Sequence, residues 1–324
     1  MFSFFKRKKQ EDQSSQISAL SDRLEWLEPM MPVQDGLPRA DWSQIYQYVD
    51  THLSESEPNQ LWASIAGTWV HHLSSHLNGE YHILESKNFV LLSAHGNHFN
   101  NTLLAFHERC LKRLLTLAKG ICSDQGHGKY VVMVFSDIDT YYDYISFYGS
   151  EEGSFGLSSG MYLNYGYGHF VFREDDIDMA EPIVAHEMTH ALLNHLPLPL
   201  WLNEGMAVNM ESAIVGGTPE RLTRSLFELH QEFWNAETIQ EFWTGNSFFR
   251  SDEGQRLSYQ MAQILVSNIS ENTDAFRDFI NLAKFDDGGE AAMNQVYDLS
   301  LADLASSFLG EGDWQAKPSS WPSN

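Results

Sequence analysis

The sequence predicts an α+β fold, in which a mixed β-sheet is followed by a mostly helical C-terminal half and preceded by a helical lead-in. Three observations predict it. A continuous valine-rich apolar run at Tyr130–Phe135 is typical of a buried strand. Shorter extended segments, bounded by turn residues, lie on both sides of this run. Beyond residue 200, apolar residues recur at the helical spacing of three and four almost to the end of the chain.

The first 22 residues predict a flexible tail that is basic and then polar. Lys6-Arg7-Lys8-Lys9 follows a very short apolar start, which reverses the order of a secretory signal. No stretch reaches the ~18 apolar residues that a membrane-spanning helix needs, so no transmembrane segment is expected. Two interpretations of residues 1–9 stay open: a solvated tail, or a weak peripheral contact with an anionic membrane surface.

Residues 23–78 predict a helical lead-in region that packs on the main domain. Apolar residues recur at helical spacing from Leu24 to about His76. Asp41 and Ser54 are residue types that commonly begin helices.

The main domain is expected to span residues 79–312 and to begin with the sheet. The segments expected to be extended are Tyr81–Ser93, a hairpin broken at Ser86-Lys87-Asn88, then Tyr130–Phe135, and Met161–Leu163 and His169–Phe172 at a sheet edge. Helices are expected between them at 101–121, where Gly120 is the stop signal, and at 141–147.

A helix over Met179–Leu196 opens the second half and is ended by Pro197 and Pro199. The helices expected after it span 200–213, 219–232, 237–243, 254–270, 274–284, 289–296 and 301–308. Residues 313–324 are rich in proline and serine, which predicts a second flexible tail.

Composition limits the possible partners. Hydrophobic residues make up 43% of the 324 residues, enough for a packed core. The formal charge of −24 repels phosphates and argues against a nucleic acid partner. The only cysteines, Cys110 and Cys122, exclude a disulfide framework and favour a reducing, cytoplasmic location. The oligomeric state stays open.

The most specific motif is Ala185-His186-Glu187-Met188-Thr189-His190. Two histidines four residues apart lie on one face of a helix, about one turn from each other, and can bind a single metal ion. Glu187 stands beside the first histidine, where it can act on a metal-bound water. This is the pattern of a catalytic zinc site that needs one more ligand.

Glu204 is the candidate third ligand, thirteen residues after His190. A metzincin would carry a third histidine ten residues after His186, but that position is Leu196. A peptide deformylase would use a cysteine, and the surroundings of Cys122 do not match that motif. Two nitrogens, one carboxylate and an open position describe a hydrolytic zinc centre.

The motif His186-Glu187-Met188-Thr189-His190, followed by Trp201-Leu202-Asn203-Glu204-Gly205-Met206-Ala207, resembles the gluzincin zinc metallopeptidases. The second stretch is similar to that of aminopeptidase N-type enzymes. The shorter spacer, and the order of strands before helices, resemble more closely the bacterial peptidase MA-like domains. The resemblance covers about residues 80–310. It implies a thermolysin-like catalytic fold, Zn²⁺ bound by His186, His190 and Glu204, and Glu187 as the general base.

The resemblance also implies two further sets of site residues. Tyr259 falls where gluzincins of this kind carry a tyrosine whose hydroxyl stabilises the oxyanion. Gly160-Met161-Tyr162 resembles the edge strand along which these enzymes bind an extended peptide.

Two positions depart from the family pattern. The stretch Ser159–Asn164 lacks the glutamate with which aminopeptidase N-type enzymes hold a free amine. Val208 stands four residues after Glu204, where thermolysin-type enzymes carry an aspartate that orients the first histidine. Glu211, two turns after Glu204, is the candidate substitute.

The sequence therefore predicts a zinc-dependent peptidase that acts on peptide or protein substrates. The alternative is a zinc-holding binding module without proteolytic activity, because the two departures remove groups that the related enzymes use.

Overall fold

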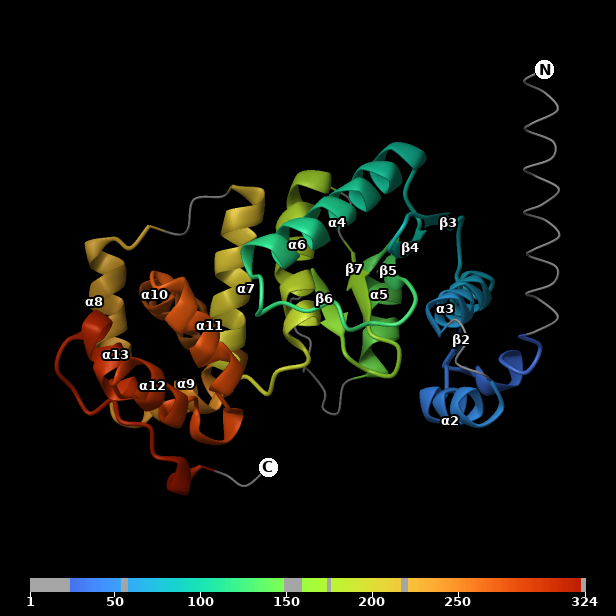
Figure 1. Cartoon of the computed structure of the whole chain (residues 1–324). Coiled ribbons are helices and arrows are strands. Elements are labelled where there is room, and N and C mark those ends of the chain that lie inside the picture. The colour runs from blue at the N-terminus through green and yellow to red at the C-terminus, as the bar shows by residue number, and fades with distance from the viewer. Residues whose placement is uncertain (1–23, 54–57, 149–158, 174–175, 217–220, 322–324) are drawn as a thin grey trace, which may run out of the picture. The chain divides into compact units, whose positions relative to one another are not determined.

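The structure, a computed structural model, describes residues 24–53, 58–148, 159–173, 176–216 and 221–321. The chain divides into two compact units, one made of residues 1–108 and 126–175 and the other of residues 109–125 and 176–324. We call the first the sheet unit and the second the helical unit, after the elements that each contains (Figure 1).

The division between the units does not fall at residues 78–79, where we expected the lead-in to end. It falls inside helix α4 (Asn97–Leu117) and again at residue 175. The lead-in and the sheet therefore belong to one unit. A single zincin-like domain over 79–312 stays a prediction.

The described part of the lead-in is α-helical only from residue 42. Its helices are α2 (Trp42–His52) and α3 (Pro58–Ser74). Asp41 caps α2 as expected, because its carboxylate accepts a hydrogen bond from the backbone N–H of Gln44 at 3.0 Å. The expected helix start at Ser54, the basic tail 1–22 and the membrane contact of residues 1–9 lie outside the described residues.

The prediction of helix from Leu24 onward was wrong for residues 24–41. This segment holds a short 3₁₀ helix, η1 (Glu28–Met30), and a two-stranded hairpin of β1 (Val33–Gln34) and β2 (Leu37–Pro38). Three prolines lie in this stretch, and proline cannot donate the hydrogen bonds of a helix interior. Asp35 and Gly36 both adopt positive φ, at 50° and 82°, as the two-residue turn of a hairpin requires.

The sheet unit is built on a five-stranded mixed sheet in the order β3-β4-β5-β7-β6. Its strands are β3 (His82–Glu85), β4 (Phe89–Ser93), β5 (Tyr130–Val134), β6 (Gly160–Leu163) and β7 (His169–Phe172). The strands β4, β5 and β7 are parallel, whereas β3 and β6 pair antiparallel at the edges. The predicted hairpin and the buried central strand are confirmed. The edge position expected for β7 was wrong, since β7 lies between β5 and β6 with all four residues buried.

Both faces of this sheet are covered. Neighbouring residues of a strand point to opposite faces, so Phe170 and Val171 mark the two sides. Val171 belongs to the core that contains Trp69 of α3. On the other side, the ring of Phe170 packs against His107 of α4. The helix α5 (Ile138–Ser146) follows β5, as predicted for 141–147.

The helical unit begins its main run with α6 (Ile177–Leu193) and α7 (Leu200–Val215). The helices that follow are α8 (Arg224–Phe233), α9 (Thr238–Thr244), α10 (Glu253–Ser270), α11 (Thr273–Leu282), α12 (Glu290–Tyr297) and α13 (Leu301–Leu309), with short 3₁₀ turns η2 (Asn246–Phe249), η3 (Phe285–Asp287) and η4 (Pro318–Ser320). Each helix predicted after residue 200 is confirmed, although α8 begins later than expected. Among the described residues, no helix has both the length and the apolar character needed to cross a bilayer.

The flexible tail predicted at 313–324 was wrong for the described residues 313–321. Trp314 is buried, and its carbonyl accepts a hydrogen bond from the indole N–H of Trp243 at 3.0 Å. The indole N–H of Trp321 donates to Gln240 Oε1 on α9 at 3.0 Å. Tryptophan burial outweighs the proline and serine content that suggested a loose end.

Candidate metal centre

The two helices that carry the motif lie against each other in the helical unit. α6 carries His186 and His190 one turn apart, with ring centroids 4.7 Å from each other. Pro197 and Pro199 separate α6 from α7, which starts at Leu200. The fully buried Trp201 fixes the start of α7, because its indole N–H donates to the carbonyl of Gly288 at 2.9 Å. The chain reversal brings Glu204, one turn into α7, to the histidines of α6.

The three predicted ligands converge. Glu204 Oε2 lies 3.2 Å from His186 Nε2 and 3.5 Å from His190 Nε2. These donor atoms all lie within 4.8 Å of one another, and the three side chains are mostly buried. Bonds of about 2.0–2.1 Å around a tetrahedral zinc ion separate neighbouring ligand atoms by about 3.3 Å. The two distances from Glu204 Oε2 fit that requirement.

The oxygen at the centre of the cluster has an unusual environment. Glu204 Oε2 is buried and, within the described part of the chain, makes no hydrogen bond of acceptable geometry, although both imidazole nitrogens are close. A buried carboxylate oxygen normally accepts hydrogen bonds that offset its desolvation. Two imidazole nitrogens and one carboxylate oxygen gathered around a point are an arrangement that could hold a metal ion.

The outer nitrogens of both imidazoles have partners that fix the rings. His190 Nδ1 lies 2.9 Å from Asn203 Oδ1, and His186 Nδ1 lies 3.4 Å from Glu211 Oε2. An acceptor at Nδ1 holds the proton there and leaves the Nε2 lone pair for a metal. Glu211 therefore lies next to His186, and its role as a substitute for the aspartate that is absent at position 208 stays a prediction. Seven residues are close to two helical turns, so Glu204 and Glu211 share a face of α7.

Asn203 was missed by the sequence reasoning. Its position next to Glu204 in the motif was the available signal, since a polar residue beside a ligand at the start of a helix is placed to reach the neighbouring helix.

Charge interactions within the cluster oppose the effect of burial. Burial lowers the pKa of His186, but the carboxylates of Glu204 and Glu211 outweigh it, and the net pKa is raised. Burial likewise lowers the pKa of His190, and Glu204 reverses the shift. Burial raises the pKa of Glu204, but the two imidazoles lower it well below its ordinary value. The carboxylate of Glu204 and the two imidazoles therefore stabilise each other's charged forms, and a divalent cation bound to them would displace the imidazole protons.

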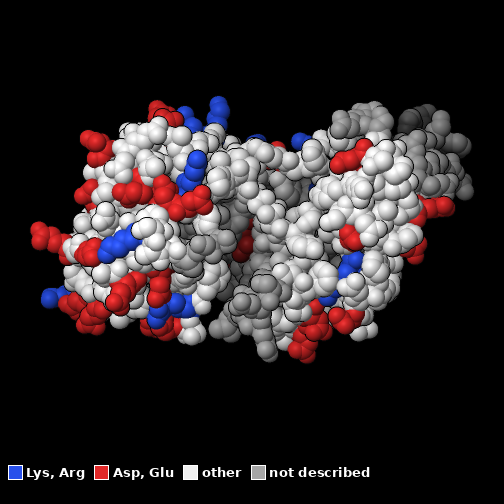
Figure 2. Space-filling model, turned by 90° about the horizontal axis from the view of Figure 1, so that it is seen from below, with Lys and Arg blue, Asp and Glu red and all other residues white. Residues whose placement is uncertain are grey.

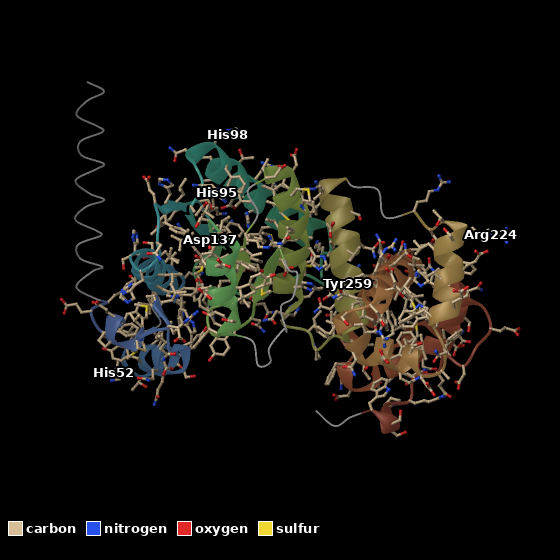
Figure 3. The ribbon with its side chains drawn as sticks, turned by 180° about the vertical axis from the view of Figure 1, so that it is seen from behind. His52, His95, His98, Asp137, Arg224 and Tyr259 are labelled. Carbon is tan, nitrogen blue, oxygen red and sulfur yellow. The ribbon has the colours of Figure 1, made fainter. Side chains whose placement is uncertain are left out.

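Glu187 and Tyr259 border the same cluster. The carboxylate of Glu187 is close enough to raise the pKa of both His186 and His190. The ring centroid of Tyr259 on α10 lies 6.5 Å from that of His186, and Phe248 packs edge-on against it at 5.2 Å. Figure 3 shows Tyr259 beside α7. Burial, and then the charges of Glu204 and Glu187, raise the pKa of Tyr259, so its phenol keeps its proton at neutral pH and can donate a hydrogen bond.

The predicted substrate-binding residues Gly160, Met161 and Tyr162 belong to the other unit. They form most of β6, the edge strand that pairs on one side with β7. A strand at this position is the type of element that can pair with an extended peptide. Their role in substrate binding stays a prediction.

The surface agrees with the acidic composition. On the face drawn in Figure 2, red carboxylate side chains are more numerous than blue basic ones. No basic stripe of the kind that tracks a phosphate backbone is visible on this face.

No protein-family model and no curated protein sequence matches the chain. The gluzincin resemblance and the thermolysin-like form of the α+β fold therefore rest on the motifs and on the cluster described above.

Proposed function

We propose that the chain is a zinc-dependent peptidase of the gluzincin type, with His186, His190 and Glu204 as the ligands. The observation that carries this proposal is the convergence of the two Nε2 atoms on the orphaned Oε2 atom of Glu204, at 3.2 and 3.5 Å. Two neutral nitrogens and one carboxylate leave a zinc ion with a net positive charge and an open position, which distinguishes hydrolytic sites from structural ones.

When bound, zinc supplies a Lewis acid that polarises the scissile carbonyl and lowers the pKa of water to about 7. The chain's own groups supply the proton transfers. Glu187, beside His186 on α6, accepts a proton from the attacking water and then delivers it to the leaving amine. The protonated Tyr259 donates a hydrogen bond to the oxygen on which negative charge develops.

The first experiment combines metal analysis with cleavage of a mixed peptide library, followed by mass spectrometry. Wild type should bind one zinc ion per chain and cleave peptides, and a chelator should stop cleavage. Glu187→Gln should keep zinc and reduce kcat/KM at least ~100-fold, since positioned general bases contribute about 10²–10⁴-fold. Tyr259→Phe should keep zinc and lower kcat by about 10²–10³-fold, as loss of one oxyanion donor does.

Glu181→Gln is the matched control for Glu187→Gln. Glu181 lies on the same helix and pairs with Arg109 at 3.7 Å, outside the cluster. Full activity is expected in this variant. Undiminished turnover in Glu187→Gln would exclude the proposed base. Zinc bound tightly without cleavage of any peptide would instead favour the zinc-holding binding module.

A further inference from the structure

The contact between α7 and α10 contains a feature that the zinc chemistry does not itself require. Gly205, the residue after the ligand Glu204, lies almost against the backbone of α10. A Cβ atom at this position would come within 2.6 Å of the carbonyl oxygen of Ala262 and of a methyl group of Val266. Only glycine allows this approach without displacing a helix. The turn of α7 that carries Glu204 is therefore also a turn that packs closely against α10.

Asn209 ties the same two helices together. Its side-chain amide nitrogen donates to the carbonyl of Gly205, one turn back on α7, at 2.7 Å. It also donates to the carbonyl of Gln263 on α10 at 2.9 Å. Gly205 and Asn209 are four residues apart, so they lie on one face of α7. Together they set how close α10 approaches and at which turn.

Tyr259 lies one turn before Gln263 on α10, and its ring centroid lies 6.5 Å from that of His186. A slide of α10 by a fraction of a turn would carry the phenol away from the metal ligands. Apolar packing alone tolerates such slides better than a hydrogen bond does, because a hydrogen bond weakens steeply with distance and angle.

We propose that Asn209 is a positioning residue that holds Tyr259 in register with the ligands, through its bond to the carbonyl of Gln263. This inference rests on the proposed function and adds to it a residue that positions Tyr259. Tyr259 contacts the reacting oxygen, and Asn209 acts only through Tyr259.

The test is a double-mutant cycle on kcat with a cleaved library peptide. Asn209→Ala should keep one zinc ion per chain and lower kcat on the order of 10- to 100-fold with little change in KM, since misplacement of about 1 Å has an effect of this size. In the Tyr259→Phe background, Asn209→Ala should lower kcat less than twofold. If the double variant lost kcat by the product of the two single effects, the proposal would be overturned, because Asn209 would then act independently of Tyr259.

Asn281→Ala is the matched control. Asn281 on α11 has the same bonding pattern, since its amide nitrogen donates to the carbonyl of Arg277 four residues earlier and to a distant carbonyl, that of Gly120. Its removal deletes the same kinds of hydrogen bond within the helical unit but leaves α10 and Tyr259 untouched. Its kcat should stay within twofold of wild type. A loss equal to that of Asn209→Ala would show that general loosening, and not positioning, explains both.

Asn209→Ser separates the two bonds of Asn209 and serves if Asn209→Ala does not fold. A serine hydroxyl can still donate to the carbonyl four residues earlier on its own helix, but it is too short to reach α10. It should therefore lose as much kcat as Asn209→Ala. Wild-type kcat in this serine variant would overturn the proposal.

A second readout needs no activity. Proteins labelled with 3-fluorotyrosine and loaded with Co²⁺ report how far each ring lies from the metal, through paramagnetic relaxation of the fluorine signal, and Tyr259→Phe identifies the signal of Tyr259. Asn209→Ala should reduce this relaxation, and Asn281→Ala should not. If wild type binds metal but cleaves nothing, the peptidase proposal fails, yet this measurement still decides the positioning. Unchanged relaxation in Asn209→Ala would overturn it.

Discussion

The fully buried His107 and His169 of the sheet unit and the mostly buried His186 and His190 of the helical unit have different neighbours. In the sheet unit, His107 and His169 are fully buried among aromatic rings, and the carboxylate of Glu108 near His107 does not offset the effect of burial. Burial lowers the pKa of each to about 4. In the helical unit, burial acts in the same direction on His186 and His190, yet nearby carboxylates raise the pKa of both.

This contrast shows what distinguishes a candidate site from a core. His107 and His169 behave as neutral packing residues. Both ring nitrogens of His169 have partners, the Tyr144 hydroxyl and the Tyr167 carbonyl, each at 2.8 Å. The helical unit instead brings buried acids to buried imidazoles, which costs desolvation energy on both sides. Such an arrangement makes His186, His190 and Glu204 a candidate functional site.

The largest expected effect is on zinc binding. His190→Ala removes a ligand, so the zinc content should fall from one ion per chain to none at micromolar metal, as measured by mass spectrometry of the native protein. Zinc should also stabilise wild type by about 4 kcal/mol at a free concentration 1,000 times its Kd. His169→Phe is the control from the sheet unit and should keep the ion. If His190→Ala bound zinc with the affinity of wild type, the proposed zinc site would be wrong.

The pH dependence of the metal-free protein should have opposite signs for the two pairs. Between pH 6.5 and about 4, the unfolded chain protonates residues 107 and 169 while the folded chain does not, so stability falls as the pH falls. By pH 4, each of these two histidines lowers the free energy of unfolding by an amount on the order of 3 kcal/mol. For His186 and His190 the folded chain binds the proton more tightly. Their contribution is complete below pH 6.5 and is lost as the pH rises through the raised pKa.

NMR titration of the histidine Cε1–H signals, with urea unfolding at each pH, measures both trends. The signals of His107 and His169 should titrate near pH 4, and those of His186 and His190 should titrate above 6.5. A common midpoint near 6.5 for all four would contradict the contrast between the units.

A smaller effect is expected from Glu211→Ala, which removes the group facing His186 Nδ1 at 3.4 Å. Partners of this kind typically change metal affinity by 10–100-fold, so zinc Kd should rise by about that factor. Competition with a chromophoric chelator measures it. Glu228→Ala, which breaks only an exposed pair with Arg224, should leave Kd unchanged. Equal Kd values for the two variants would show that Glu211 does not orient His186.

Local signals in the sequence were sufficient for much of the fold and for the proximity of His186, His190 and Glu204. The four-residue spacing of His186 and His190 determines their common face, and Asp41 acts as a cap through its own neighbour Gln44. The position of Glu211 near His186 was predictable for the same reason, because it shares a helix face with Glu204.

Features that depend on distant partners were not predictable. Nothing near Trp314 in the sequence indicates that Trp243 binds its carbonyl, so a buried segment had the composition of a loose tail. Asn209 likewise shows its role only when α10 is in place, because its acceptor Gln263 is 54 residues away. The chain division inside α4 also depends on contacts that no single segment contains.

The smallest effect tests the sheet-unit side of the comparison. His107 Nδ1 lies 2.9 Å from the carbonyl of Leu103, but Nε2 is buried and has no hydrogen-bond partner among the described residues. If His107 is only a packing residue, an apolar side chain of similar size should serve as well. His107→Leu should therefore raise the free energy of unfolding by up to about 1 kcal/mol at pH 8, where the imidazole is neutral. His169→Leu should lower it by about 1–3 kcal/mol, because Tyr144 loses a buried partner. Urea unfolding measures both. A large loss of stability in His107→Leu would show that Nε2 makes a stabilising interaction. His107 would then not be only a packing residue, and the contrast between the two pairs of histidines would be weaker.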